Sequence, residues 1–223
     1  GSGFIANFTA KLSFMRLLIF FTFLSFLNTI NAQKLERPDV YLGYQLGEKF
    51  TPHAKVVSYF EKIASSVKDR MKLEYYGQTY EGRDLLLAFI SSKENMLRLE
   101  EIRLNNLRMA GILNDKKPDL NMPTVVWLSY NVHGNEASST EVAMKLLYET
   151  LSGTNESLNS WLQQVVVVID PCLNPDGRDR YVNWLNQTMG KNPNPNPLAR
   201  EHSEPWPGGR TNHYNFDMNR DWA

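Results

Sequence analysis

The chain has 223 residues, of which 42% are hydrophobic, and its 24 basic and 24 acidic residues cancel in charge. This length is sufficient for one sizeable hydrophobic core. The balanced charge leaves no basic stripe or acidic tail, so the sequence predicts no nucleic-acid partner. The single cysteine, Cys172, cannot form a disulfide within the chain, and we expect it to be a small buried hydrophobic residue.

The N-terminal part of the sequence has the pattern of a secretory signal peptide. Met15 and Arg16 precede an apolar run at residues 17–27, and the segment ends in small and polar residues at Ala32. The apolar run is too short to cross a hydrocarbon core of about 30 Å, so no stable membrane anchor is expected. We therefore predict residues 1–14 to be an upstream leader, 15–32 a signal peptide, and the protein to be secreted or periplasmic.

The first helices and strands of the mature chain are predicted from the spacing of hydrophobic residues and from the positions of proline and glycine. Apolar residues at helical intervals follow Thr51, and Pro52 suits a first helical turn. Two β-like runs within residues 71–92 flank a glycine-containing turn, which predicts a hairpin. Residues 94–110 are expected to form one helix that stops at Gly111.

The second half of the sequence predicts strands alternating with helices. Residues 123–132 and 163–170 are nearly continuous apolar runs, typical of strands buried on both faces of a sheet. Between them, residues 139–151 read as a helix, with Ser138 and Glu141 as a capping box. The chain beyond Asn186 is rich in Asn and Pro and predicts a long loop. The expected fold is α/β, with a mixed, largely parallel central sheet flanked by helices.

His133 and Glu136 lie between the first apolar strand and the helix that follows it. This position is the carboxyl end of a strand, where open α/β sheets bind ligands. A histidine and a carboxylate suit zinc, and a catalytic zinc usually takes three protein ligands. The spacing is common by chance, so a solvated loop is the alternative interpretation.

Two further segments contain residues that suit a binding site. In the sequence NPDG, Pro175 and Gly177 stand at positions that predict a turn. Near the C-terminal end, Asn219 precedes Arg220. A guanidinium can bind two oxygens at once, so this pair suits a free carboxylate, although turn and surface roles are the alternative.

Taken in order, the motifs YGQTYEGR, HGNE, NPDG, RTN and DMNR resemble the zinc metallocarboxypeptidases, the carboxypeptidase A-like family. The resemblance covers about residues 47–223, including the upstream YGQTYEGR segment, and the four later motifs in order are more specific than any one of them. It implies that residues 33–223 are the amino-terminal part of one catalytic domain of that fold, truncated at its C-terminal side. It also implies one zinc ion as cofactor and the C-termini of peptides or proteins as substrates.

The resemblance implies that His133 and Glu136 are the first two zinc ligands and that Asp217 orients the His133 ring. The family's third ligand, a histidine, its tyrosine and its catalytic glutamate would follow Ala223. The remaining histidines are expected in loop or surface roles, with delivery of a third ligand by His202 or His213 as the alternative; they are His53, His202 and His213.

The resemblance also assigns roles to arginines. Asn219 and Arg220 would bind the terminal carboxylate of the substrate, and Arg210 would stabilise the oxyanion that develops at the scissile carbonyl. Arg178 and Arg180 are the alternatives to Arg210, and otherwise surface charges.

The function that follows is that of an exported zinc metallocarboxypeptidase hydrolysing C-terminal peptide bonds with zinc-activated water. The alternatives are a zinc amidase acting on small N-acyl amino acids or cell-wall peptides, and a non-catalytic peptide-binding relative. The residues of this chain alone are expected to be inactive and to leave an apolar sheet edge uncovered.

Overall fold

The computed structural model describes residues 35–220. The predicted leader and signal peptide, 1–14 and 15–32, lie outside the described residues. Within residues 35–220, no helix is both long and apolar enough to cross a membrane.

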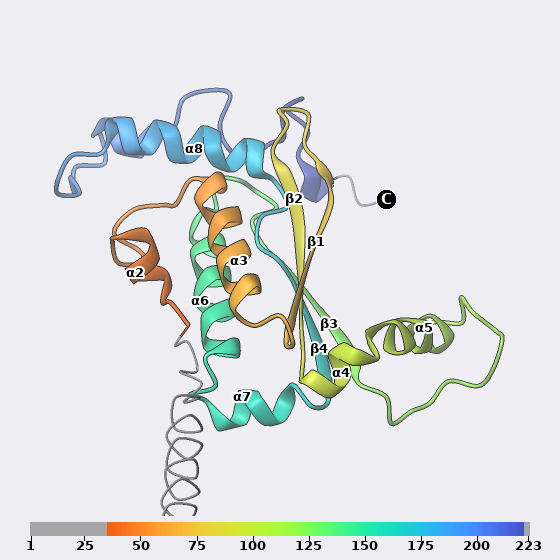
Figure 1. Ribbon diagram of the computed structural model, residues 1–223. Coiled ribbons are helices and arrows are strands. Elements are labelled where there is room, and N and C mark those ends of the chain that lie inside the picture. The colour runs from red at the N-terminus through yellow and green to blue at the C-terminus, as the bar shows by residue number, and fades with distance from the viewer. Residues whose placement is uncertain (1–34, 221–223) are drawn as a thin grey trace, which may run out of the picture. The chain divides into compact units, whose positions relative to one another are not determined.

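A mixed four-stranded sheet forms the centre of the fold (Figure 1). Its strands are β1 (Met71–Gln78), β2 (Asp84–Ile90), β3 (Thr124–Ser129) and β4 (Val165–Asp170), in the spatial order β1-β2-β4-β3. The predicted hairpin is confirmed as the antiparallel pair β1 and β2. Strand β4 pairs antiparallel with β2 and parallel with β3. The α/β class with a mixed sheet is therefore confirmed, while within the sheet of residues 35–220 only β3 and β4 pair in parallel.

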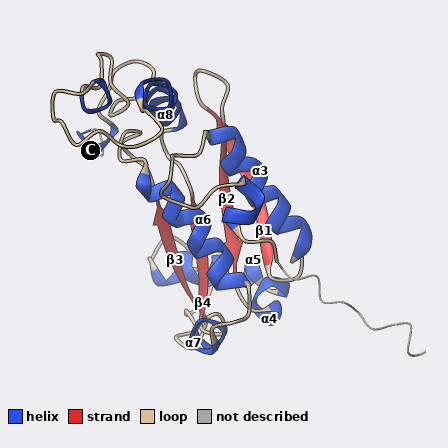
Figure 2. Cartoon of the chain, turned by 90° about the vertical axis from the view of Figure 1, so that its left-hand side faces the viewer, coloured by secondary structure: helices blue, strands red, loops and turns tan. Residues whose placement is uncertain are grey.

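Helices lie on both faces of this sheet. The described helices, some of which lie at the ends of the sheet, are α2 (Pro38–Leu42), α3 (His53–Ser66), α4 (Lys93–Leu97), α5 (Leu99–Met109), α6 (Ser138–Leu151), α7 (Glu156–Trp161) and α8 (Pro175–Thr188), with 3-10 turns η1 (Arg200–His202) and η2 (Met218–Arg220). Helices α3 and α6 run side by side over one face (Figure 2). The predicted starts of α3 and α6 agree with the structure to within two residues.

One helix was predicted where two are present, and Arg98 separates them. The backbone of Arg98 leaves the helical region at φ −117° and ψ 25°. The cause is Asn95, whose buried amide donates to the carbonyls of Leu162 and Gln163, at 3.1 and 3.0 Å. This anchor ties α4 to the start of β4 and turns the chain before α5 begins. The predicted stop is confirmed, because Gly111 follows α5 with φ +72°.

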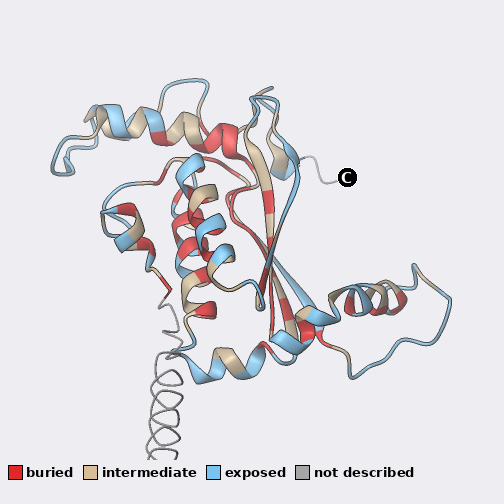
Figure 3. Cartoon of the chain, in the orientation of Figure 1, coloured by how far each residue is buried: buried red, intermediate tan, exposed pale blue. Residues whose placement is uncertain are grey.

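The side chains of β2 and β4 alternate between two clusters of the hydrophobic core, as the period of a strand requires. The larger cluster lies toward α3 and α6 and includes Leu86, Ala88, Ile90 and Ile169. The smaller one, toward α5, centres on Ile102, Val166 and Val168. Figure 3 shows that buried segments run along the sheet and along the helices that cover it.

Burial on both faces was predicted for β3, and this prediction is wrong. Trp127 is 62% exposed, and Val125 and Val126 are each more than a third exposed. Strand β3 is at the edge of the described sheet, and α5 is the helix that contacts it on the open face. An apolar run has the same sequence pattern with or without neighbours to cover it, so the pattern alone predicts burial. The exposure of β3 agrees instead with the uncovered apolar sheet edge expected from the family resemblance.

The parallel pairing of β3 and β4 brings two loops together at one edge of the sheet. Ser129 and Asp170, the last residues of these strands, stand opposite each other. The loops then continue as a pair, because Leu173 N–H donates to Tyr130 O at 2.9 Å and Asn174 N–H donates to Asn131 O at 3.2 Å. The HGNE and NPDG segments therefore lie side by side.

Candidate functional site

The turn that contains His133 is shaped by Asn131. Asn131 has φ +58°, a left-handed conformation that asparagine tolerates better than most residues. Its buried amide donates to the carbonyls of His133 at 2.6 Å, Gly134 at 3.3 Å and Glu136 at 3.2 Å. Sequence reasoning missed this residue, although an asparagine between an apolar strand and HGNE was a usable signal.

His133 lies between two carboxylates. Its Nε2 is 3.0 Å from Asp217 Oδ1, and its Nδ1 is 2.9 Å from Glu136 Oε1. The His133 ring is buried, whereas the Glu136 side chain is 62% exposed. With Nε2–H donated to Asp217, the lone pair of Nδ1 faces a carboxylate oxygen. Two acceptors that face each other at this distance suit a cation, so His133 and Glu136 could hold a metal ion.

Asp217 also fixes Arg210. The guanidinium donates through Nε to Asp217 Oδ2 at 2.9 Å, and its Nη2 forms an ion pair with the same oxygen at 2.9 Å. Its Nη1 lies 3.4 Å from His133 Nδ1. Burial raises the pKa of Asp217, but hydrogen bonds from His133 and Arg210 outweigh it and hold that pKa below its usual value. The structure thus brings together four of the predicted site residues: the ionised carboxylate of Asp217 contacts His133 and Arg210, and His133 contacts Glu136.

Asn219 and Arg220 follow in the 3-10 turn η2 and are exposed. The turn is joined to the site through the backbone, because Asn219 N–H donates to Asp217 Oδ1 at 3.1 Å. The Arg220 guanidinium donates to Asn219 O at 3.0 Å. These two side chains border the His133 cluster rather than belong to it.

Arg178, an alternative to Arg210, is fully buried and has another role. Its guanidinium donates to Glu141 Oε1 at 2.7 Å, Thr51 O at 2.8 Å and Ala137 O at 2.7 Å. A side chain with these partners is committed to holding α6, α8 and the HGNE turn together. A surface role for Arg178 is excluded by its burial.

The predicted capping role of Glu141 is wrong. Its carboxylate is buried and accepts from Thr51 N–H at 2.7 Å, Thr51 Oγ1 at 2.9 Å and Arg178. Helix α6 begins at Ser138 as expected, with Ala137 at its N-cap and no side-chain cap. A buried cation stabilises Glu141 more than the helix terminus could, so the long-range ion pair prevails.

NPDG does not form the predicted turn but begins α8. The Asn174 side chain accepts from Gly177 N–H at 3.0 Å and caps the helix, and Pro175 is the first helical residue. Asparagine as N-cap followed by proline at the first position is a common helix start. The signal was therefore present in the sequence and was read as a turn.

Three glycines place the motif segments in backbone contact. A Cβ on Gly134 would lie closer than 3.0 Å to Arg178 N, and one on Gly177 would lie closer than 3.0 Å to Gly209 O. A Cβ on Gly209 would in turn meet Gly177 O. The HGNE turn, the start of α8 and the segment before Arg210 therefore interlock at positions where no side chain fits.

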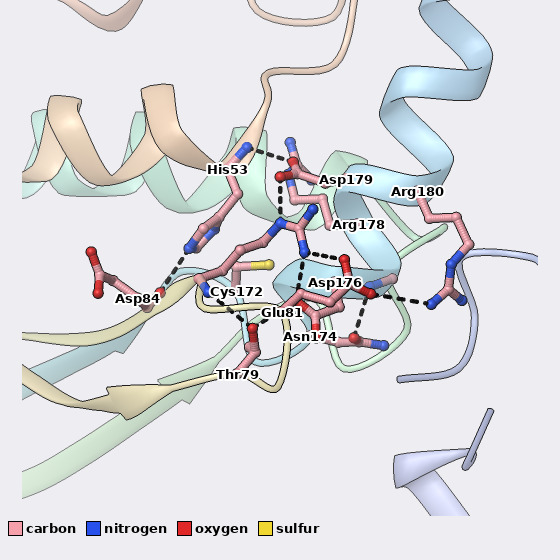
Figure 4. A network of polar contacts seen from close by, with 12 residues as sticks. His53, Thr79, Glu81, Asp84, Cys172, Asn174, Asp176, Arg178, Asp179 and Arg180 are labelled. Carbon is pink, nitrogen blue, oxygen red and sulfur yellow. Dashed lines mark hydrogen bonds and ion pairs between the residues drawn. The ribbon is translucent and has the colours of Figure 1, made fainter. Parts of the chain in front are cut away.

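The upstream YEGR motif also belongs to this assembly. Arg83 donates to Asp176 Oδ1 and Asp179 Oδ2, each at 2.8 Å, and Thr79 Oγ1 donates to Asp176 Oδ1 at 2.7 Å (Figure 4). These bonds dock the β1–β2 hairpin onto the first turn of α8. All the motifs found in the sequence thus converge at one end of the sheet.

The family model of zinc carboxypeptidases matches residues 56–223. The chain belongs to this family. Solved structures with similarity include thrombin activatable fibrinolysis inhibitor (16% identity, TM-score 0.45, 65% of this chain and 29% of that one) and carboxypeptidase A from Helicoverpa armigera (20%, 0.40, 59% and 26%). A metallo-carboxypeptidase from Burkholderia cenocepacia is 16% identical with a TM-score of 0.42, over 76% of this chain and 31% of that one. The search of curated proteins gives no significant match.

The chain spans about a third of the length of these solved structures, or less. Because the sequence identities and TM-scores of these structures are low, their activities are not transferred to this chain. Membership of the zinc carboxypeptidase family rests on the family model, and the motif contacts described above are consistent with it.

The other histidines among residues 35–220 have partners elsewhere. His202 Nε2 lies 2.6 Å from Asn194 O, and His213 Nδ1 lies 2.9 Å from Glu81 Oε1. The expected surface role of His53 is wrong, because its ring is buried against Asp84 O, and burial lowers its pKa. Among residues 35–220, no three His, Cys, Asp or Glu side chains form a metal-binding cluster.

Cys172 is buried, as predicted, and burial raises the pKa of its thiol to about 12. A thiol with so high a pKa is almost entirely protonated near neutral pH and is a poor nucleophile.

Proposed function

We propose that this chain is part of an exported zinc metallocarboxypeptidase that releases the C-terminal residue of peptide or protein substrates. The family match supports the general class of reaction. The observation that carries the proposal is the position of His133, with one ring nitrogen on Asp217 and the other facing Glu136.

His133 and Glu136 are the residues of this chain that would hold the zinc ion. The donor set fits zinc, since imidazole nitrogen and carboxylate oxygen are both common zinc ligands. Bound there, zinc would supply Lewis acidity and lower the pKa of water toward about 7. Asp217 would hold the His133 ring in the tautomer that leaves Nδ1 free to bind the metal.

Arg210 would act on the carbonyl of the bond that is cleaved. Its guanidinium is held beside His133 by Asp217, and it would present donors to the negative charge that develops on the carbonyl oxygen. Because this charge is greatest in the transition state, Arg210 would raise kcat more than it would improve substrate binding.

Asn219 and Arg220 would bind the terminal carboxylate of the substrate. Both side chains are exposed, and the planar fork of a guanidinium matches the two oxygens of a carboxylate. The Asn219 N–H donates to Asp217 Oδ1, so the proposed carboxylate site would lie next to the residue that would orient His133.

Export is part of the proposal and is supported by the sequence of residues 15–32, which has a basic start, an apolar run and a small-residue end. We propose cleavage after Ala32, so the mature protein would begin at Gln33. Secretion or passage to the periplasm would place the enzyme where extracellular peptides are its substrates.

The test uses the complete protein that contains this chain, with zinc present, and a mixed pool of peptides. Release of C-terminal amino acids is expected, with kcat lowered about a hundred- to thousandfold in Arg210→Ala. Arg220→Ala should mainly raise KM. Arg200→Ala, which changes an exposed arginine in the 3-10 turn η1, is the matched control and should leave both constants unchanged.

Two outcomes would overturn the proposal. Turnover of N-acyl amino acids or cell-wall peptides, with no release of amino acids from ordinary peptides, would make the protein an amidase. Saturable peptide binding without hydrolysis of any of these substrates would make it a non-catalytic binding protein.

A further inference from the structure

We propose that Arg180 is a positioning residue that holds the backbone on both sides of Arg210. Arg180 extends from α8, and its Nη1 donates to Gly208 O at 2.8 Å while its Nη2 donates to Asn212 O at 3.3 Å. The two carbonyls flank Arg210, two residues away in each direction. This inference rests on the catalytic role proposed for Arg210.

The chemistry of the contact requires an arginine. The two amino groups of one guanidinium point in fixed, divergent directions and can bridge two carbonyls, whereas a lysine ammonium is a single compact charge. The Arg180 side chain is only 23% exposed, and its charge is offset by Glu81 Oε1 at 3.9 Å (Figure 4). Arg180 is therefore ordered on both sides, by backbone carbonyls and by a carboxylate.

Other hydrogen bonds also fix the backbone of residues 208–212. Asn174, the cap of α8, donates through Nδ2 to Arg210 O at 3.3 Å. Glu204 accepts from Gly209 N–H, and it also accepts from Asn135 Nδ2 at 3.0 Å in the HGNE turn. Residues 208–212 are thus tied to α8 and to the turn that carries His133, although they lie in a loop without regular structure.

The consequence concerns the direction of the Arg210 side chain. Its bonds to Asp217 and its approach to His133 depend on a loop backbone that would otherwise be mobile. Removal of the Arg180 bridge frees the backbone on both sides of Arg210. Because catalytic groups tolerate little displacement, kcat should fall about a hundredfold with little change in KM. Arg180 has no bond to His133 or Glu136 among the contacts described, so zinc binding should be retained.

The experiment compares Arg180→Ala and Arg180→Lys with the matched control Arg200→Ala in the complete protein. Metal content and kcat and KM for peptide hydrolysis are measured for each. The lysine variant keeps the charge opposite Glu81 but lacks the fork, so it should recover less than a tenth of the lost kcat. Retained zinc with a large loss of kcat in both Arg180 variants is the expected result.

A second readout does not depend on activity. Limited trypsin digestion cuts after Arg200, which is exposed, and after Arg210 only when its segment is loosened. Both Arg180 variants should show at least tenfold faster cleavage after Arg210, with unchanged cleavage after Arg200. If the alanine variant does not fold, as judged by its thermal melt, the lysine variant decides.

Wild-type kcat and wild-type cleavage after Arg210 in a folded Arg180 variant would overturn the inference. If Arg210→Ala is fully active while Arg180→Ala accelerates cleavage after Arg210, the catalytic role of Arg210 fails and the structural clamp stands. Faster cleavage after Arg200 as well would indicate general loosening of the chain and would also refute a specific clamp.

Discussion

The buried pair of Glu141 and Arg178 gives the sharpest test of how the motifs are held together. The carboxylate of Glu141 accepts hydrogen bonds from Arg178 and from both the N–H and the hydroxyl of Thr51. Both side chains are at most 6% exposed. Glu141→Gln keeps the shape of the side chain, removes the charge and leaves a buried guanidinium without its anion.

Breaking a buried ion pair in this way costs about 3–5 kcal/mol. That is a large fraction of the total stability of a domain, which is about 5–15 kcal/mol. For a domain of this size the midpoint of thermal unfolding should fall by about 6–20 °C. The matched control is Glu100→Gln, which breaks an exposed pair with Arg103 on α5 and should cost less than about 1 kcal/mol.

The assay is urea or thermal unfolding of the wild type, Glu141→Gln, Arg178→Met and the double variant. Because the two charges interact directly, the double variant should be less destabilised than the sum of the single variants. Additive losses, or a Glu141→Gln variant as stable as Glu100→Gln, would refute the view that this pair fastens the HGNE turn to α8.

Three more variants test other contacts. Burial raises the pKa of Asp170 to about 6 against hydrogen bonds from Tyr76 O–H and the Cys172 backbone. The folded state therefore favours the protonated carboxyl. The free energy of unfolding of the wild type should fall by about 3 kcal/mol relative to that of Asp170→Asn as the pH rises from about 4 to 6, and should fall no further above that. A difference between the two proteins in urea unfolding that does not change with pH would contradict this. Gly177→Ala should destabilise the fold by about 1–3 kcal/mol because its Cβ meets Gly209 O, while Gly190→Ala, where the nearest atom is 3.6 Å away, should be tolerated in the same unfolding assay. Asp217→Ala should weaken zinc binding about ten- to a hundredfold in equilibrium dialysis, and unchanged affinity would remove its role in orienting the His133 ring.

The fold could be predicted where it depends on local pattern. The spacing of apolar residues located the hairpin, the strands and α6, and the position of HGNE at a strand's carboxyl end followed from them. The exposure of β3 could not be predicted from its own apolar pattern, because whether an apolar strand is covered depends on other parts of the fold; the uncovered sheet edge was expected only from the family resemblance. The break at Arg98 depends on the contacts that Asn95 makes with Leu162 and Gln163, which are far away in the sequence.

In the candidate site, too, the residues identified by local motifs were predicted and those that depend on long-range contacts were not. The family motifs identified His133, Glu136, Asp217 and Arg210, and the structure brings these side chains within hydrogen-bonding distance of one another. The residues that hold them were missed because their partners are backbone atoms or distant charges; they are Asn131, Glu141, Asn174, Arg178, Arg180 and Glu204. Its sequence position suggested that Glu141 caps a helix, but its distant partners make it half of a buried ion pair. Asn174 was expected in a turn, but it caps α8 because Pro175 follows it and starts the helix.

The central claim, that His133 and Glu136 hold a catalytic zinc ion, is tested most directly by metal analysis of the complete protein and its His133→Ala variant. The account predicts one zinc ion per wild-type chain, and loss of both the zinc and the release of C-terminal amino acids in the variant, because removing one ligand leaves too little coordination energy. His202→Ala, an exposed histidine bonded to Asn194 O, is the control and should retain both. Full retention of zinc in His133→Ala would contradict the assignment.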